Sequence, residues 1–228
     1  MQGKEEIKMI EISTSILSVK EENSVKTFYN LETAKTDYFH IDVMDGKFVE
    51  NNTTEQMRQY AENIRQISNS QLDVHLMVKE PNEYIEEYIP LEPSFITIHY
   101  EAFNNKEELL KTINKIKENG MKCGLAIKPE TDISEIYEYL KYIHMVLVMT
   151  VEPGKGGQKL IPETIDKIRK LKEYITENNL DIFIEADGGI NQENIEELTK
   201  AGIDIAVAGS SIILAEDYAD TIKKLKNA

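Results

Sequence analysis

The chain has 228 residues, of which 41% are hydrophobic and 29% charged, as in a folded protein rather than a disordered one. Its formal net charge of −15 argues against nucleic acids and anionic membranes as partners. The single cysteine, Cys123, excludes an intrachain disulfide and fits a reducing compartment. No segment resembles a signal peptide or a membrane span. We therefore expect a cytoplasmic protein with one domain over residues 1–228, of which residues 1–8 form a flexible extension.

Short apolar, β-branched runs alternate with amphipathic stretches along the chain, and each run predicts a strand. In chain order these runs are Ile10–Leu17, Tyr38–Val43, Leu72–Val78, Phe95–His99, Lys122–Ile127, Met145–Thr150, Ile182–Ala186 and Ile205–Ala208.

Helical periodicity fills the stretches between these runs. Leu109, Ile113 and Ile116 fall on one helical face before Gly120, and a second apolar stripe follows Pro162. Strands that alternate with helices predict a parallel sheet in an α/β protein. About eight such units without a long linker predict a closed (β/α)8 TIM barrel, with a doubly wound open sheet as the alternative.

Two imidazoles and two carboxylates lie at the ends of three predicted strands. Alternation places His40 and Asp42 on one face of the second strand, while His75 lies in the third and Asp187 ends the seventh. Each residue by itself is typical of a structural position, but strand ends converge at the mouth of a barrel. The set fits one divalent cation; we expect Zn²⁺, although Fe²⁺, Mn²⁺ and Co²⁺ accept the same ligands.

The two carboxylates also suit proton transfer. Inversion of a carbon beside a carbonyl removes a proton from one face and returns one to the other, and Asp42 and Asp187 could do this. A cation would stabilise the enediolate between the two steps. Met44, Met77 and Met149 would give the site a dry lining, with core packing as the alternative for Met149.

Glycine-rich segments follow the sixth, seventh and eighth predicted strands. Backbone N–H groups in such loops and at a helix N-terminus bind anions, and barrel enzymes often bind phosphate at these strands. A plain tight turn is the alternative for the first segment. These segments predict an anion site formed by Gly157, Gly189, Gly209 and Ser210.

The chain resembles ribulose-phosphate 3-epimerases over nearly its whole length after Met9. The matching segments are 15–18, 40–46, 73–78, 148–151, 156–158 and 187–189. The resemblance implies a barrel of the ribulose-phosphate-binding type that acts on D-ribulose 5-phosphate and forms homo-oligomers. It implies that the two histidines and two aspartates above hold the metal, with the aspartates as the acid/base pair. It also implies that Ser15 and His75 contact the substrate. The residues that it implies for binding the sugar and its phosphate are Gly154, Lys155, Gly156, Gly157, Gly188, Gly189, Gly209 and Ser210.

Departures from the family pattern cluster at the expected mouth of the site. Lys47, Glu50 and Asn52 stand where the pattern has a histidine, a proline and an aliphatic residue. Lys155 replaces an aromatic residue and either contacts phosphate or is solvated, and Thr14 replaces a proline. None of these changes removes a proposed metal ligand or proton carrier, but they leave the identity of the sugar open.

Three other functions compete with this interpretation. An allulose-6-phosphate 3-epimerase would use the same metal and aspartates on a longer sugar. A non-catalytic phosphosugar-binding barrel would require the loss of an aspartate or metal ligand, and all four are present. An aldolase or decarboxylase would need a positioned lysine, for which the strand ends offer Lys128. We expect His99 and His144 to lie outside the site.

Overall fold

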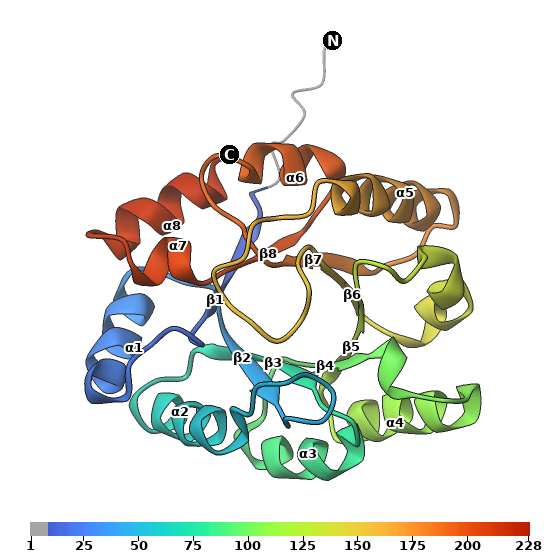
Figure 1. Ribbon diagram of the computed structural model, residues 1–228, viewed down its shortest axis with the longest axis horizontal. Coiled ribbons are helices and arrows are strands. Elements are labelled where there is room, and N and C mark those ends of the chain that lie inside the picture. The colour runs from blue at the N-terminus through green and yellow to red at the C-terminus, as the bar shows by residue number, and fades with distance from the viewer. Residues whose placement is uncertain (1–8) are drawn as a thin grey trace.

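The computed structural model describes residues 9–228, which form a closed barrel of eight parallel strands (Figure 1). The strands are β1 (Glu11–Ser15), β2 (Tyr38–Met44), β3 (Gln71–Met77), β4 (Phe95–His99), β5 (Lys122–Ile127), β6 (Met145–Met149), β7 (Phe183–Asp187) and β8 (Ile205–Ala208). The barrel closes through pairing of β1 with β8. The predicted TIM barrel is confirmed and the open sheet is wrong. The expected flexible extension, residues 1–8, lies outside the described residues.

Helices surround the barrel and cover the outer face of every strand (Figure 1). They are α1 (Ser24–Thr33), α2 (Thr54–Ile67), α3 (Pro81–Tyr88), α4 (Lys106–Glu118), α5 (Glu163–Glu177), α6 (Ile195–Ala201), α7 (Ser210–Ile213) and α8 (Tyr218–Lys226). Short 3-10 helices span Glu21–Asn23, Ile89–Leu91 and Tyr100–Ala102, and a longer one, Ile133–Tyr142, stands between β5 and β6. Within residues 9–228, no helix is both long and apolar enough to cross a bilayer.

The alternation of side chains separates an apolar outer layer from a polar barrel interior. Outward residues such as Ile41 and Val74 join the large hydrophobic cluster between the strands and the helices. The inward residues at the N-terminal ends of the strands form a second, largely aromatic cluster that includes Tyr38 and Phe95. Above this layer a small apolar cluster around Leu147 and Met149 lies beside a group of buried polar side chains, which are costly unless they are paired or bind a ligand.

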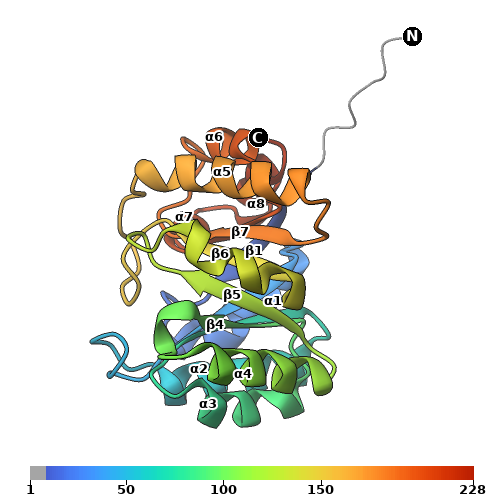
Figure 2. The same ribbon diagram turned by 90° about the vertical axis from the view of Figure 1, so that its right-hand side faces the viewer.

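Strand boundaries differ from the predicted ones by two residues at most. β1 ends at Ser15 rather than at Leu17, because the Leu17 amide turns back toward Ser15 Oγ at 3.4 Å. β7 extends to Asp187, so this residue is the last of its strand. The loops after β2 and β6 project from the same end of the barrel (Figure 2).

Candidate metal centre

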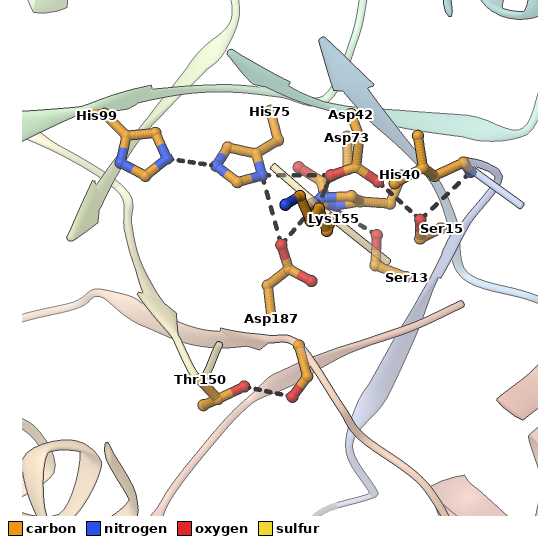
Figure 3. Close-up of polar contacts among 12 residues, drawn as sticks. Ser13, Ser15, His40, Asp42, Asp73, His75, His99, Thr150, Lys155 and Asp187 are labelled. Carbon is orange, nitrogen blue, oxygen red and sulfur yellow. Dashed lines mark hydrogen bonds and ion pairs between the residues drawn. The ribbon is translucent and has the colours of Figure 1, made fainter. Parts of the chain in front are cut away.

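The four predicted metal ligands converge inside the C-terminal mouth of the barrel (Figure 3). The parallel register of β2 and β3 places Asp42 directly beside His75. Asp42 Oδ1 lies 3.4 Å from His40 Nε2 and 3.6 Å from His75 Nδ1. Asp187 Oδ2, from β7, lies 3.8 Å and 3.5 Å from the same two nitrogens. The potential ligand atoms of these four residues all lie within 4.8 Å of one another.

This geometry fits a tetrahedral cation. Ligand atoms about 2.0–2.2 Å from a tetrahedral ion are separated by about 3.3–3.6 Å, and the nitrogen–oxygen separations here are 3.4–3.8 Å. In the described part of the chain, His40 Nε2 and His75 Nδ1 are buried and have no hydrogen-bond partner. Unpaired buried nitrogens are costly, and a cation between them would remove that cost.

A buried carboxylate orients His40 from behind. His40 Nδ1 lies 2.6 Å from Asp73 Oδ2, which also accepts a hydrogen bond from Ser13 Oγ at 2.8 Å. Because the carboxylate accepts at Nδ1, the Nε2 lone pair of His40 faces the site. The sequence analysis did not single out Asp73, although alternation in β3 places it on the same inner face as His75.

The electrostatics of the cluster couple its histidines to its carboxylates. Burial lowers the pKa of His40, but the charges of Asp73 and Asp42 outweigh it and raise that pKa well above its usual value. Burial raises the pKa of Asp42, but His40 and His75 outweigh it and lower that pKa strongly. Burial and the charge of Asp73 raise the pKa of Glu185, deeper in the barrel. A cation must therefore compete with protons on the histidines, and its affinity should fall at low pH.

The two aspartates have different surroundings. Ser15 Oγ donates a hydrogen bond to Asp42 Oδ2 at 2.7 Å, so one oxygen of this carboxylate is fixed while the other faces the histidines. The Asp187 side chain is 13% exposed, compared with 7% for Asp42. The structure thus places Ser15, an expected substrate contact, where it also holds a proposed proton carrier in position.

A pocket opens above this cluster at the C-terminal mouth of the barrel. Both aspartates line it. His75, an expected substrate contact, is fully buried and does not appear among the residues that line it. The other expected substrate contacts all line this pocket: Ser15, Met44, Met77, Met149, Gly154, Lys155, Gly156, Gly157, Gly188, Gly189, Gly209 and Ser210.

Two of these glycines also have a packing role. Gly188 has φ +124°, and a Cβ there would lie 2.3 Å from Val151 Cγ2. Gly189 has φ +68°, and a Cβ there would lie 2.5 Å from the backbone nitrogen of Leu160. Positive φ and such close approaches both require glycine. These residues therefore let the loops after β6 and β7 pack together, in addition to any contact with a ligand.

The loops after β2 and β6, which carry most of the departures from the family pattern, contact each other. Asn51 Nδ2 donates a hydrogen bond to the Gly154 carbonyl oxygen at 2.6 Å, which ties the loop after β2 to the loop after β6. Lys155 Nζ lies 3.6 Å from Glu50 Oε2, and both side chains are exposed. Two residues that differ from the pattern are thus paired with each other.

The remaining basic candidates lie outside the ligand set. His99 is not a ligand, but its Nε2 lies 2.9 Å from His75 Nε2, a contact that the sequence analysis missed. His144 is half-buried, and its Nδ1 accepts a hydrogen bond from the Cys123 amide at 3.2 Å. Lys128 Nζ lies over the Phe48 ring, 4.6 Å from its centroid, and does not line the pocket, which gives no support to a lysine-dependent aldolase.

Comparison with known proteins places these features in one family. The model of the ribulose-phosphate 3 epimerase family matches residues 11–213. A ribulose-phosphate 3-epimerase from Synechocystis sp. is 36% identical over 221 residues, covering 97% of this chain and 95% of that protein. One from Methanocaldococcus jannaschii is 39% identical over 220 residues, covering 96% and 91%. The solved structure of a 3-keto-L-gulonate-6-phosphate decarboxylase from Vibrio cholerae has a TM-score of 0.74 at 13% identity and covers 96% of each chain, which shows a shared fold. This chain therefore belongs to the ribulose-phosphate 3-epimerase family of enzymes.

Proposed function

We propose that this protein interconverts D-ribulose 5-phosphate and D-xylulose 5-phosphate by inverting C3, with Asp42 and Asp187 as the proton carriers. The observation that carries the proposal is the position of these carboxylates. They come from β2 and β7, on different sides of the barrel (Figure 1), and meet at the same pair of histidines beneath the pocket. A substrate seated above the histidines would present opposite faces of C3 to the two carboxylates.

The residues divide the work of inversion between them. One aspartate takes the C3 proton from one face, and the other supplies a proton to the opposite face. Ser15, which donates to Asp42 Oδ2, keeps the second oxygen of Asp42 directed into the site. The buried methionines that line the pocket, Met44, Met77 and Met149, keep water away from the carbanion.

His40, Asp42, His75 and Asp187 would hold one divalent cation. Zn²⁺ is the preferred candidate because the separations of the donor atoms fit a tetrahedral site with nitrogen and oxygen ligands. Fe²⁺, Mn²⁺ and Co²⁺ accept the same donors. When bound, the cation would supply Lewis-acid stabilisation of negative charge on the substrate oxygens.

The phosphate group would lie against the glycine-rich loops. Gly157, Gly189, Gly209 and Ser210 all line the same pocket, which supports a backbone-based anion site. Among the pocket-lining residues within 9–228, Lys155 is the only cationic side chain. It could add charge to the site when its pairing with Glu50 opens.

We further propose a single-domain, cytoplasmic homo-oligomer. The closed barrel over the described residues supports one domain. The free, buried Cys123 fits a reducing compartment. Exposed apolar side chains such as Tyr29 and Leu214 offer surface for a second copy. Light scattering on the purified protein would give the number of subunits.

Epimerase activity with defined metal content tests the main proposal. The purified protein should convert ribulose 5-phosphate, lose activity after treatment with a chelator and regain it with Zn²⁺, Fe²⁺, Mn²⁺ or Co²⁺. The paired departures Glu50 and Lys155 at the mouth favour testing allulose 6-phosphate in parallel. Faster turnover of allulose 6-phosphate would assign that sugar instead. Binding of both sugars without turnover would point to a non-catalytic barrel.

A further inference from the structure

Behind the proposed ligand His75 lies a series of hydrogen-bonding groups, which runs through His99 to the partly buried Glu101. His75 Nε2 lies 2.9 Å from His99 Nε2, as Figure 3 shows. The ring planes are close to parallel, with an interplanar angle of 25° and centroids 5.0 Å apart, so a nitrogen of one ring points at a nitrogen of the other. On its other side, His99 Nδ1 lies 3.2 Å from Glu101 Oε2. Both histidines are fully buried, so water does not compete for these contacts.

At the Glu101 end of this series, the donor and acceptor of each hydrogen bond can be assigned. Glu101 Oε1 lies 2.8 Å from the Lys128 backbone nitrogen and 2.5 Å from Thr131 Oγ1. A backbone N–H can only donate, so Oε1 must be an acceptor. As a carboxylate, Glu101 also accepts at Oε2, and His99 Nδ1 must therefore carry a hydrogen atom.

The assignment at Glu101 fixes the donor and acceptor nitrogens of both imidazole rings. A neutral imidazole that donates at Nδ1 accepts at Nε2, so His99 Nε2 accepts a hydrogen bond from His75 Nε2. With its hydrogen atom on Nε2, His75 has its lone pair on Nδ1. That is the nitrogen that lies 3.6 Å from Asp42 Oδ1 and 3.5 Å from Asp187 Oδ2.

We propose that Glu101 and His99 are positioning residues that fix the tautomer of His75, so that its Nδ1 lone pair points at the cation. The inference rests on the proposed metal site and extends it outward to the end of β4 and the 3-10 helix that follows it. It also makes the two ligand histidines equivalent in design. A carboxylate backs each of them: the buried Asp73 lies directly behind His40, and the partly buried Glu101 lies behind His75 through one additional imidazole.

Glu101→Gln is the most direct test, because it should reverse the direction of the hydrogen bonds through His99 and His75 without removing the side chain. The Lys128 N–H still requires an acceptor, so the amide oxygen takes the place of Oε1 and the NH₂ group faces His99. His99 then accepts at Nδ1 and carries its hydrogen atom on Nε2. His75 must in turn accept at Nε2 and carry its hydrogen atom on Nδ1, in the place of the cation. We expect the affinity for Zn²⁺ to fall by about 10- to 100-fold.

Matched variants separate the effect of hydrogen-bond direction from the effects of charge and of packing. Glu130→Gln removes the same charge from an exposed position in the loop after β5, near the backbone that Glu101 contacts, and should leave Zn²⁺ affinity unchanged. His99→Gln keeps an acceptor toward His75 and a donor toward Glu101, so it should retain most of the affinity. His99→Leu removes both groups and should lose at least as much affinity as Glu101→Gln.

Two measurements that do not depend on turnover decide the matter: competition of each protein with a chromophoric chelator for Zn²⁺, and long-range ¹⁵N–¹H NMR of the imidazoles. The chain has only four histidines, so their signals can be assigned. The wild type should show a hydrogen atom on His99 Nδ1, and Glu101→Gln should show it on His99 Nε2, with His40 unchanged.

The outcomes are distinct. Equal Zn²⁺ affinity for Glu101→Gln and Glu130→Gln, or a wild-type His99 with its hydrogen atom on Nε2, would overturn the positioning role of Glu101 and His99 while leaving the metal site intact. A wild type that binds no Zn²⁺ would overturn both the metal site and the positioning role of Glu101 and His99. If Glu101→Gln fails to fold, the contrast between His99→Gln and His99→Leu decides, and equal affinities for these two would also overturn the proposal.

Discussion

Asp42→Asn and Asp187→Asn test the two-carboxylate mechanism most directly. Asparagine keeps the shape of aspartate but cannot carry a proton between substrate and solvent. In Asp42→Asn, the amide NH₂ group can donate to Ser15 Oγ, which lies 2.7 Å from Oδ2 in the wild type. The amide oxygen can then stay near His40 and His75 and still face the cation. The fold and part of the metal affinity should therefore survive.

The expected loss is large. Removal of a general base costs a factor of about 10²–10⁴, which corresponds to about 3–5 kcal/mol in the activation barrier. Because both aspartates are also proposed ligands, and an amide oxygen is a poorer ligand than a carboxylate, metal content must be measured first. Rates are then compared only between preparations with one equivalent of metal.

Isotope exchange distinguishes the two carboxylates. A variant with one remaining carboxylate can remove a proton from one epimer and return it to the same face. In D₂O, deuterium should enter C3 of one epimer slowly and without inversion, as followed by NMR. The epimer that exchanges should switch between the two variants, since each keeps the opposite carboxylate. A metal-replete variant of either kind that epimerises within about tenfold of wild type would refute the assignment.

Three further predictions concern the loops at the mouth of the barrel and the carboxylate of Glu101. Gly188→Ala places a Cβ 2.3 Å from Val151 Cγ2 at φ +124°, so it should destabilise the protein by about 1–3 kcal/mol. Gly157→Ala, at φ +72° and with no described atom within 4 Å of its Cβ, should lower the melting temperature less; an equal loss would show that backbone strain outweighs the clash. Burial raises the pKa of Glu101, but hydrogen bonds from an imidazole, a backbone amide and a hydroxyl lower it from 4.5 to about 2. Its folded-state pKa is depressed, so it stabilises the fold above pH 4.5, and this contribution disappears as the pH falls through about 2. Urea titrations of metal-free protein should therefore show a weaker decline over this range for Glu101→Gln than for wild type, and parallel declines would contradict the depressed pKa. Lys155→Met should raise KM for the phosphosugar by roughly two- to tenfold, with kcat unchanged and with a smaller effect at high salt; a KM that does not change would mean that this lysine is only a solvated loop residue.

The sequence by itself determined the kind of fold and which side chains face inward. The alternation of short apolar runs with amphipathic stretches was sufficient for a barrel, because each strand and helix carries its own period. Because side chains alternate along a strand, the sequence placed His40 and Asp42 on one face of the second strand. Because the C-terminal ends of parallel strands meet at one end of a barrel, it also placed Asp187 near them. Glycine-rich segments after three strands pointed to a pocket with a backbone lining for the same reason.

Only the tertiary structure decided which groups touch across strands. The period of a strand gives the face of a side chain but not the residue beside it on the next strand, since the stagger of the strands is set by closure of the whole barrel. Asp73 behind His40, and His99 with Glu101 behind His75, follow from that stagger. The pairing of loop residues about a hundred positions apart, as in Asn51 with Gly154, likewise depends on how the finished barrel brings its loops together.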